Sequence, residues 1–418
     1  MKIKYCFLQG LYWMLFCAGG GFVTAYLVGI GVEASTVGVV TATFCALSAL
    51  MQPVLGKLAD KGRHFHWINQ LKIMALITIV CNLILLVQEE RTVSAILFGI
   101  ILLCLNCSMP FVNGASFYYE NRGYKMNFGV ARGIGSLSYA FVSMILGKLM
   151  ASMGEKAVCL TGLVIGVLLL LVIFLFHEVP LPGEGDTETG NKKAGEKAQT
   201  EDPIEKERGN AVASTLSDGH SSMSQIEFVK RYPYFMLMLV GFLCLLAAHN
   251  IANTYLLQMV QRVGGGSEEM GLTLSLAAVL EIPVMFLVSS IVKRWPVNKL
   301  LLASGIFFTL KMVIYVFATN VYMIYAAQIL QPFSYALFAT VCVYFAQEVM
   351  DEENKLRGQT FVSSSITLGA VLGNLTGGVV VQNFGVGTML QMSVMICLIG
   401  TVIIGLFHTR AVSGHAVK

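Results

Sequence analysis

The apolar stretch at residues 156–177 reads KAVCLTGLVIGVLLLLVIFLFH, and it decides the class of this protein. Between Lys156 and His177 no residue carries a charge, so the stretch has the roughly 20 apolar residues that a membrane-spanning helix needs. The same length criterion, applied outward in both directions, gives five more stretches before it and six after it. We therefore expect an all-α membrane protein with twelve transmembrane helices.

The twelve expected spans form two sets of six. The first set lies near residues 8–30, 36–57, 67–88, 93–119, 128–150 and 156–177, and the second near 233–257, 270–292, 298–318, 321–349, 358–381 and 386–408.

The composition supports this class. Of 418 residues, 56% are hydrophobic and only 12% are charged, about half the charged fraction of a soluble domain. This excludes soluble globular, disordered and nucleic-acid-binding proteins. Of the ten cysteines, only Cys104 and Cys107 are close neighbours, in an apolar segment with no second pair. We interpret the cysteines as packing residues and expect neither a metal nor a cofactor.

The segment between the two sets has a different character. Residues 183–210 read GEGDTETGNKKAGEKAQTEDPIEKERGN, which is too polar to bury a core. We expect a six-helix bundle at 1–178, a flexible linker at 179–232 and a second six-helix bundle at 233–418.

The basic residues predict the orientation. With both termini in the cytoplasm, 21 of the 28 Lys and Arg residues fall in inner segments, whereas Arg91, Lys156 and Arg262 are external and Lys148 lies near an outer end. We therefore expect a multi-pass protein of the cell membrane with cytoplasmic termini and linker, and we expect a monomer.

Residues 56–63, between the second and third spans, read GKLADKGR. This motif resembles the Gly-x-Leu-Ala-Asp-(x)-x-Gly-Arg loop of the major facilitator superfamily, one residue shorter than the commonest form. The resemblance implies two pseudo-symmetric bundles that alternate access to a midplane cavity. It also implies a gating role for Gly56, Asp60, Gly62 and Arg63.

Residues 119–139 read YENRGYKMNFGVARGIGSLSY and resemble the oligosaccharide:proton symporter branch, typified by lactose permeases. In that branch a Glu and an Arg bind sugar hydroxyls and an aromatic residue stacks on the sugar ring. The matching positions here are Glu120, Arg132 and Tyr139, with Ser116 nearby.

The second half departs from this branch. Lys311 occupies the position of an Arg in the ninth span of that branch, and Gln331 that of a His in the tenth. Asn250 and Asn253 occupy the positions of acidic residues in the seventh span. Ser334 and Ala278 replace two further glutamates, although Glu281 lies three residues beyond Ala278.

Ionisable residues inside apolar spans are functional candidates, because each costs about 2.5–3.5 kcal/mol on insertion. Glu281 and Lys311 lie at depths that differ by about 3 Å on consecutive helices, so we expect them to approach each other. The proton-coupling candidates are therefore Glu281, Lys311 and His249, and we expect Glu281 to carry the proton. A purely structural pair is the alternative, as is a helix–helix hydrogen bond for His249.

Arg132, Ser136 and Tyr139 share one face of the fifth span, and Asn113, Ser116 and Glu120 share one face of the fourth. We expect Glu120 to pair with Arg132 and the two faces to bind a polyhydroxylated ring, opposite Asn250, Asn253 and Gln331. The alternative is an Arg132 that only extends toward the cytoplasm.

These features predict a secondary transporter, not an enzyme, that couples uptake of a sugar or nucleoside to protons. The alternatives are an exporter of amphipathic compounds and a membrane sensor that transports nothing.

Overall fold

The computed structural model describes residues 1–59, 66–179, 225–351 and 354–413. In these ranges the regular structure is entirely helical. The expected linker lies mostly outside the described residues, as do Asp60, Gly62 and Arg63 of the expected gating loop.

The first half contains six passages. They are formed by α1 (Lys2–Phe16) continued through η1 (Cys17–Gly21) and α2 (Val23–Gly29), and by α3 (Ala34–Ala59), α4 (Trp67–Val87), α5 (Arg91–Glu120), α6 (Phe128–Met153) and α7 (Lys156–Phe174).

The second half begins with the short helix α9 (Gln225–Arg231), inside the expected linker. Its passages are α10 (Pro233–Thr254) continued by α11 (Leu256–Arg262), then α12 (Ser267–Arg294), α13 (Val297–Phe317), the composite of α14 (Val321–Ala327), η3 (Gln328–Leu330), η4 (Pro332–Ala336) and α15 (Leu337–Val349), and finally α16 (Lys355–Ser413). In α9, Phe228 is fully buried and its ring stacks on that of Phe361 at 5.0 Å, which explains why this polar stretch ends in a helix.

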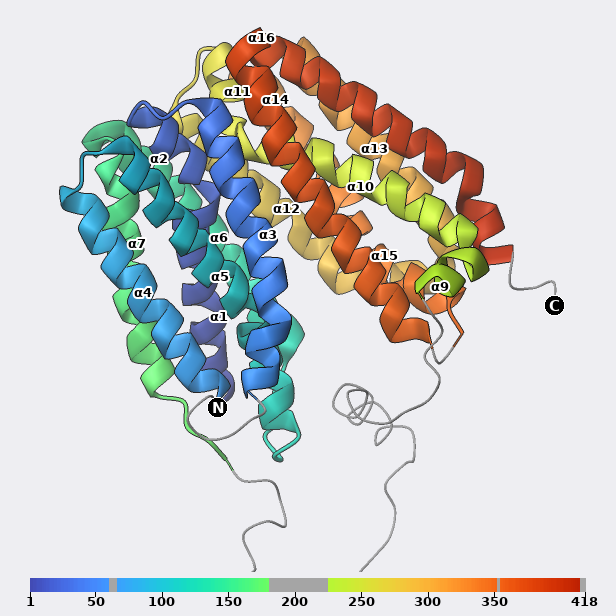
Figure 1. The fold of residues 1–418 in the computed structure, drawn as a ribbon, viewed down its shortest axis with the longest axis horizontal. Coiled ribbons are helices and arrows are strands. Elements are labelled where there is room, and N and C mark those ends of the chain that lie inside the picture. The colour runs from blue at the N-terminus through green and yellow to red at the C-terminus, as the bar shows by residue number, and fades with distance from the viewer. Residues whose placement is uncertain (60–65, 180–224, 352–353, 414–418) are drawn as a thin grey trace, which may run out of the picture.

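Helix α16 makes two passages rather than one. Its 59 residues would extend about 90 Å if straight, three times the thickness of a bilayer core. At Gly385 the backbone leaves the helical region, with φ 79° and ψ 170°. The two arms of α16 run back from their turn on either side of α10 (Figure 1). The eleven apolar helices long enough to span a membrane in the described residues therefore supply twelve passages, six in each half, as the sequence predicts.

The two halves meet through two helix pairs, α6 with α12 and α3 with α16. Both contacts rely on glycine. A Cβ on Gly147 of α6 would lie 2.5 Å from the carbonyl oxygen of Ser267, and one on Gly378 of α16 would lie 2.6 Å from that of Ala34. These positions therefore permit a backbone approach that any side chain would prevent.

Polar contacts join the halves at the same end. The Ala34 N–H donates to Gln382 Oε1 at 3.1 Å, and Lys148 forms an ion pair with Glu268 at 3.8 Å. Away from this end the halves diverge toward the side at which the N-terminus and α9 lie (Figure 1). The molecule is thus closed at one end of the interface and splayed at the other.

Candidate functional site

The tenth passage is irregular where its polar residues lie. Pro332 has no N–H to donate, and around it the helix changes from α to 3-10 geometry in η3 and to π geometry in η4. The turns involved carry Gln328, Gln331 and Ser334, all of them buried. The first passage has a similar interruption in η1, at the glycines that follow Ala18.

A continuous set of hydrogen bonds connects the eighth, ninth and tenth passages, and we call it the C-half network (Glu281, Lys311, Tyr315, Gln328 and Gln331). Lys311 Nζ donates to Gln328 Oε1 at 3.1 Å and also to Gln331 Oε1. Gln331 Nε2 donates to Glu281 Oε1 at 2.7 Å, and Gln328 Nε2 donates to the Tyr315 hydroxyl at 2.7 Å. The ammonium group of Lys311, a residue only 2% exposed, is thus held by two amide oxygens.

The expected approach of Glu281 and Lys311 takes an indirect form. No ion pair within 4.0 Å joins them in the described part of the chain. Gln331 lies between them, with its carbonyl toward the cation and its amide N–H toward the carboxylate. The sequence comparison placed Gln331 among the substrate-binding residues, whereas its contacts make it the bridge of this network.

His249, Asn250 and Asn253 lie on α10. The His249 ring stacks on Tyr335 at 4.3 Å, and its Nε2 lies 2.9 Å from Asn253 Nδ2. Asn250 Nδ2 donates to the carbonyl of Leu246. Asn253 is exposed, whereas Asn250 is half-buried. His249 is therefore engaged in a hydrogen bond with a residue of its own helix, which differs from the helix–helix hydrogen bond of its structural alternative.

On the first half, a second set of contacts surrounds Arg132, and we call it the N-half cluster (Gln9, Trp13, Arg132 and Ser136). Arg132 Nη1 donates to Ser136 Oγ at 2.8 Å, and its guanidinium carbon lies 3.9 Å from the centroid of the Trp13 ring. Trp13 Nε1 donates to Gln9 Oε1 at 3.1 Å. Gly135 makes room for the indole, since a Cβ there would lie 2.5 Å from Trp13 Cδ1.

Gln9 and Trp13 were absent from the sequence-based site. Gln9 is fully buried, and its Nε2 donates to the Tyr5 hydroxyl at 2.9 Å and to Asn113 Oδ1 at 3.2 Å. The signal was available: a Gln and a Trp four residues apart share one face of an apolar span. Without a partner helix, however, nothing in the sequence places that face against Arg132.

The expected pair of Glu120 and Arg132 is not formed, and this prediction is wrong. Glu120 is the last residue of α5 and is exposed. Arg132 lies one turn inside α6 and extends away from that end, toward Ser136 and Trp13. The connection between α5 and α6 is short, but the Arg132 side chain extends toward Ser136 and Trp13 rather than toward Glu120.

The remaining candidates of the first half lie close to the N-half cluster. Asn113 contacts Gln9, and Ser116 Oγ donates to the Asn113 carbonyl at 3.2 Å. The Tyr139 hydroxyl lies against η1, where a Cβ on Gly21 would be 2.7 Å away.

Gly56 is the one residue of the expected gating-loop set that the structure describes. It lies in α3, and no atom is within 4 Å of the position that a Cβ would take.

The N-half cluster and the C-half network act on one another electrostatically. Glu281 lies within Coulombic range of both Lys311 and Arg132, and Tyr335 lies within range of Glu281 and Arg132. The Glu281 carboxylate thus interacts with a cation of each half, Lys311 in the second half and Arg132 in the first.

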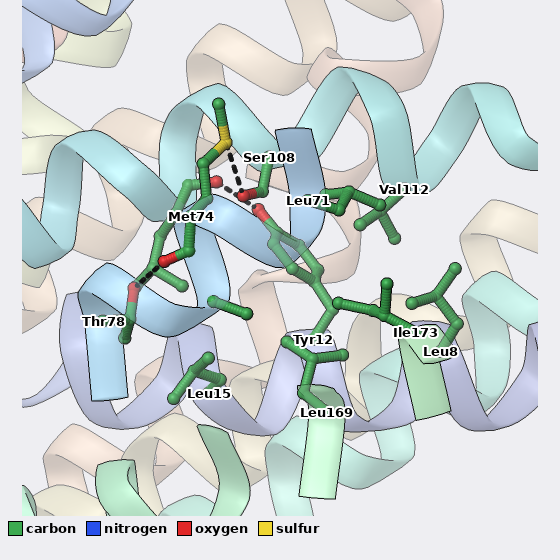
Figure 2. A pocket seen from close by; sticks show the side chains of 12 residues that line it. Leu8, Tyr12, Leu15, Leu71, Met74, Thr78, Ser108, Val112, Leu169 and Ile173 are labelled. Atoms are coloured by element: carbon green, nitrogen blue, oxygen red, sulfur yellow. Dashed lines mark hydrogen bonds between the residues drawn. The ribbon is translucent and has the colours of Figure 1, made fainter. Parts of the chain in front are cut away.

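A small cavity inside the first half is a different feature. Figure 2 shows it between α1, α4, α5 and α7, where Tyr12 OH donates to the Leu105 carbonyl and Ser108 Oγ donates to the Cys104 carbonyl at 2.7 Å. Its volume of about 10 Å³ holds at most one water molecule. It is a packing gap rather than a solute site. The described residues also contain no group of three or more His, Cys, Asp or Glu placed to hold a metal ion.

Comparisons with known structures agree with this architecture. A mutant of the nucleoside transporter NupG superimposes with a TM-score of 0.76 at 12% identity, over 98% of this chain and 99% of that one. A bacterial homologue of the human lysosomal transporter Spinster gives 0.63 at 14% identity, over 98% and 95%. A mutant of the peptide transporter POT gives 0.70 at 13% identity, over 97% and 94%.

A search of curated protein sequences finds no significant match. The model of the MFS_1 like family matches residues 5–392, nearly the whole chain. The chain therefore belongs to the MFS_1 like family and has the fold of the major facilitator transporters.

Proposed function

We propose that this membrane transporter couples the uptake of a small polyhydroxylated solute, a sugar or a nucleoside, to the movement of protons. The observation that carries the proposal is the position of Glu281, which is bridged by Gln331 to Lys311 on its own half and is close enough to Arg132 on the other half to interact with its charge. A carboxylate whose charged neighbours belong to two moving bodies changes its electrostatic environment when those bodies move. It is then able to take up and release a proton as access alternates.

The N-half cluster suits a polyhydroxylated ring. The guanidinium of Arg132 is half-buried and has five N–H donors, of which Ser136 accepts one. The remaining donors are available for neighbouring hydroxyls, with the faces of Trp13 and Tyr139 close by.

We propose further that the splayed end faces the cytoplasm of a cell membrane, because the basic termini and loops gather there. Single cysteines at Lys125 and Glu89, introduced without the native cysteines, test this orientation in intact cells. A membrane-impermeant maleimide is expected to label the Glu89 site and not the Lys125 site. The reverse pattern overturns the orientation.

Solute-induced proton movement tests the function. Purified protein is reconstituted into vesicles with a trapped pH dye, and sugars, nucleosides and amphipathic drugs are added in turn. One sugar or nucleoside is expected to drive protons into the vesicles, whereas protein-free vesicles show no change. Proton efflux on adding an amphipathic drug would instead indicate an exporter, and binding without any flux would indicate a sensor.

A further inference from the structure

The centre of the molecule contains an uneven set of charges. In the described residues, two cations and one carboxylate interact there: Arg132, Lys311 and Glu281. The other basic residues within the spans lie elsewhere, with Lys72 over the Phe174 ring at 4.9 Å and Lys148 paired with Glu268. His249, the remaining ionisable candidate, adds no negative charge in either protonation state.

The C-half network neutralises one of the two cations. Lys311 donates to the carbonyl of Gln331, and the amide of Gln331 donates to Glu281. This orientation fits a cation at one end of the glutamine and a carboxylate at the other, because Lys only donates and a carboxylate only accepts. Lys311 and Glu281 thus form a bridged pair with no net charge.

Arg132 interacts with Glu281 only at longer range and has no carboxylate in direct contact. Its hydrogen-bond partner Ser136 is neutral, and its face rests on the Trp13 ring. No acidic oxygen lies within 4.0 Å of it in the part of the chain that the structure describes. A guanidinium stays charged at any pH that proteins tolerate, and a half-buried charge without a partner is costly.

We propose that the solute supplies this missing charge, so that the substrate is a sugar acid: a polyhydroxylated ring with one carboxylate. This inference rests on the proposed transport of a polyhydroxylated solute and narrows its class. A carboxylate matches the planar fork of an arginine in a bidentate contact. Its single charge also balances the single excess cation, whereas a phosphate monoester would bring up to about two negative charges.

The proposal has an electrical consequence. A neutral sugar that enters with one proton carries one positive charge across the membrane. A sugar acid that enters with one proton carries none, because the carboxylate cancels the proton. Uptake of the proposed substrate is therefore electroneutral and does not respond to the membrane potential.

Matched pairs of solutes test both points on the complete protein in vesicles with an imposed pH gradient. The pairs are glucose with glucuronate and galactose with galacturonate, with glucose 6-phosphate as the doubly charged comparison. We expect one acid to be taken up at least about tenfold more efficiently than its neutral partner and than the phosphate. We also expect its rate to stay the same when potassium and valinomycin set the inside negative.

A neutral sugar or nucleoside that is preferred over the acids, and whose uptake is accelerated by an inside-negative potential, overturns this inference and leaves the proposed function intact. Preference for the phosphate also overturns it. Absence of uptake for every sugar, nucleoside and acid contradicts the proposed function itself.

A substitution of Arg132 tests whether this residue is the cation that binds the carboxylate of the solute. Arg132→Gln removes the cation, so it is expected to lower uptake of the acid at least about tenfold more than uptake of the neutral partner, and thus to abolish the preference for the acid. Lys72→Gln removes a cation outside the N-half cluster and should keep the preference for the acid. An unchanged preference in folded Arg132→Gln overturns the assignment. If that variant does not fold, the response of the unmodified protein to potential decides alone.

Discussion

The two halves of this transporter hold their intramembrane cations in different ways. In the C-half network, Lys311 is 2% exposed and bonded to two glutamines, one of which continues to Glu281. In the N-half cluster, Arg132 is half-buried, bonds Ser136 and stacks on Trp13. One cation is enclosed by protein, and the other is only positioned by it.

This difference separates two tasks. A buried charge that has every partner supplied by protein depends on those partners for its stability, so losing one is costly. A charge with free donors contributes less to stability and is available to a ligand. We therefore expect substitutions in the C-half network to affect stability and coupling, and substitutions in the N-half cluster to affect affinity.

The largest loss of stability is expected for Gln331→Leu. This change removes the bridge and leaves the Lys311 ammonium and the Glu281 carboxylate each short of a partner inside the protein. We expect a cost of about 3 kcal/mol, measured as a lower unfolding midpoint in detergent. Gln52→Leu is the matched control, because Gln52 donates a single bond to the Asn106 carbonyl and should cost about 1 kcal/mol. Equal unfolding midpoints for the two variants would show that the Gln331 bridge contributes no more to stability than a single hydrogen bond, and would contradict the stabilising role of the C-half network.

A smaller effect is expected for Gly147→Ala, which acts on the contact that holds the halves together. The new Cβ meets the Ser267 carbonyl across the interface, and overpacking of this kind costs about 1–3 kcal/mol. The closed end should open more often, so that a cysteine at Ser267 reacts faster with a maleimide. Gly114→Ala serves as control, since no atom lies within 4 Å of a Cβ there. Equal reactivity in both variants would contradict the role of this contact.

A still smaller effect, on binding alone, is expected for Arg132→Lys. Lysine keeps the charge but lacks the planar fork, so solute affinity should fall about tenfold, or about 1.4 kcal/mol. The unfolding midpoint without solute should stay close to that of Arg91→Lys, a change at an exposed helix start. A large drop in the midpoint with unchanged affinity would make Arg132 a structural residue like Lys311.

Much of the fold was accessible from the sequence, because uncharged stretches of sufficient length have few alternatives to a membrane helix. The ionisable residues inside the spans were likewise found individually, since charges there are rare. Their partners were not. The bridge that Gln331 forms between Lys311 and Glu281 was not foreseen, Trp13 was missed, and Glu120 was paired wrongly with Arg132. Each of these depends on side-chain direction and on contacts between separate helices, which the spacing along one helix does not contain.

The central claim, that Glu281 couples solute movement to protons, is tested most directly by Glu281→Gln in reconstituted vesicles. Glutamine resembles the protonated carboxyl and still accepts the hydrogen bond from Gln331 Nε2. The variant is predicted to exchange labelled for unlabelled solute across the membrane at a rate similar to the unmodified protein, but to lose all accumulation driven by a pH gradient. A variant that still concentrates its solute when a pH gradient is imposed would contradict the account, because the proton would then travel through another group.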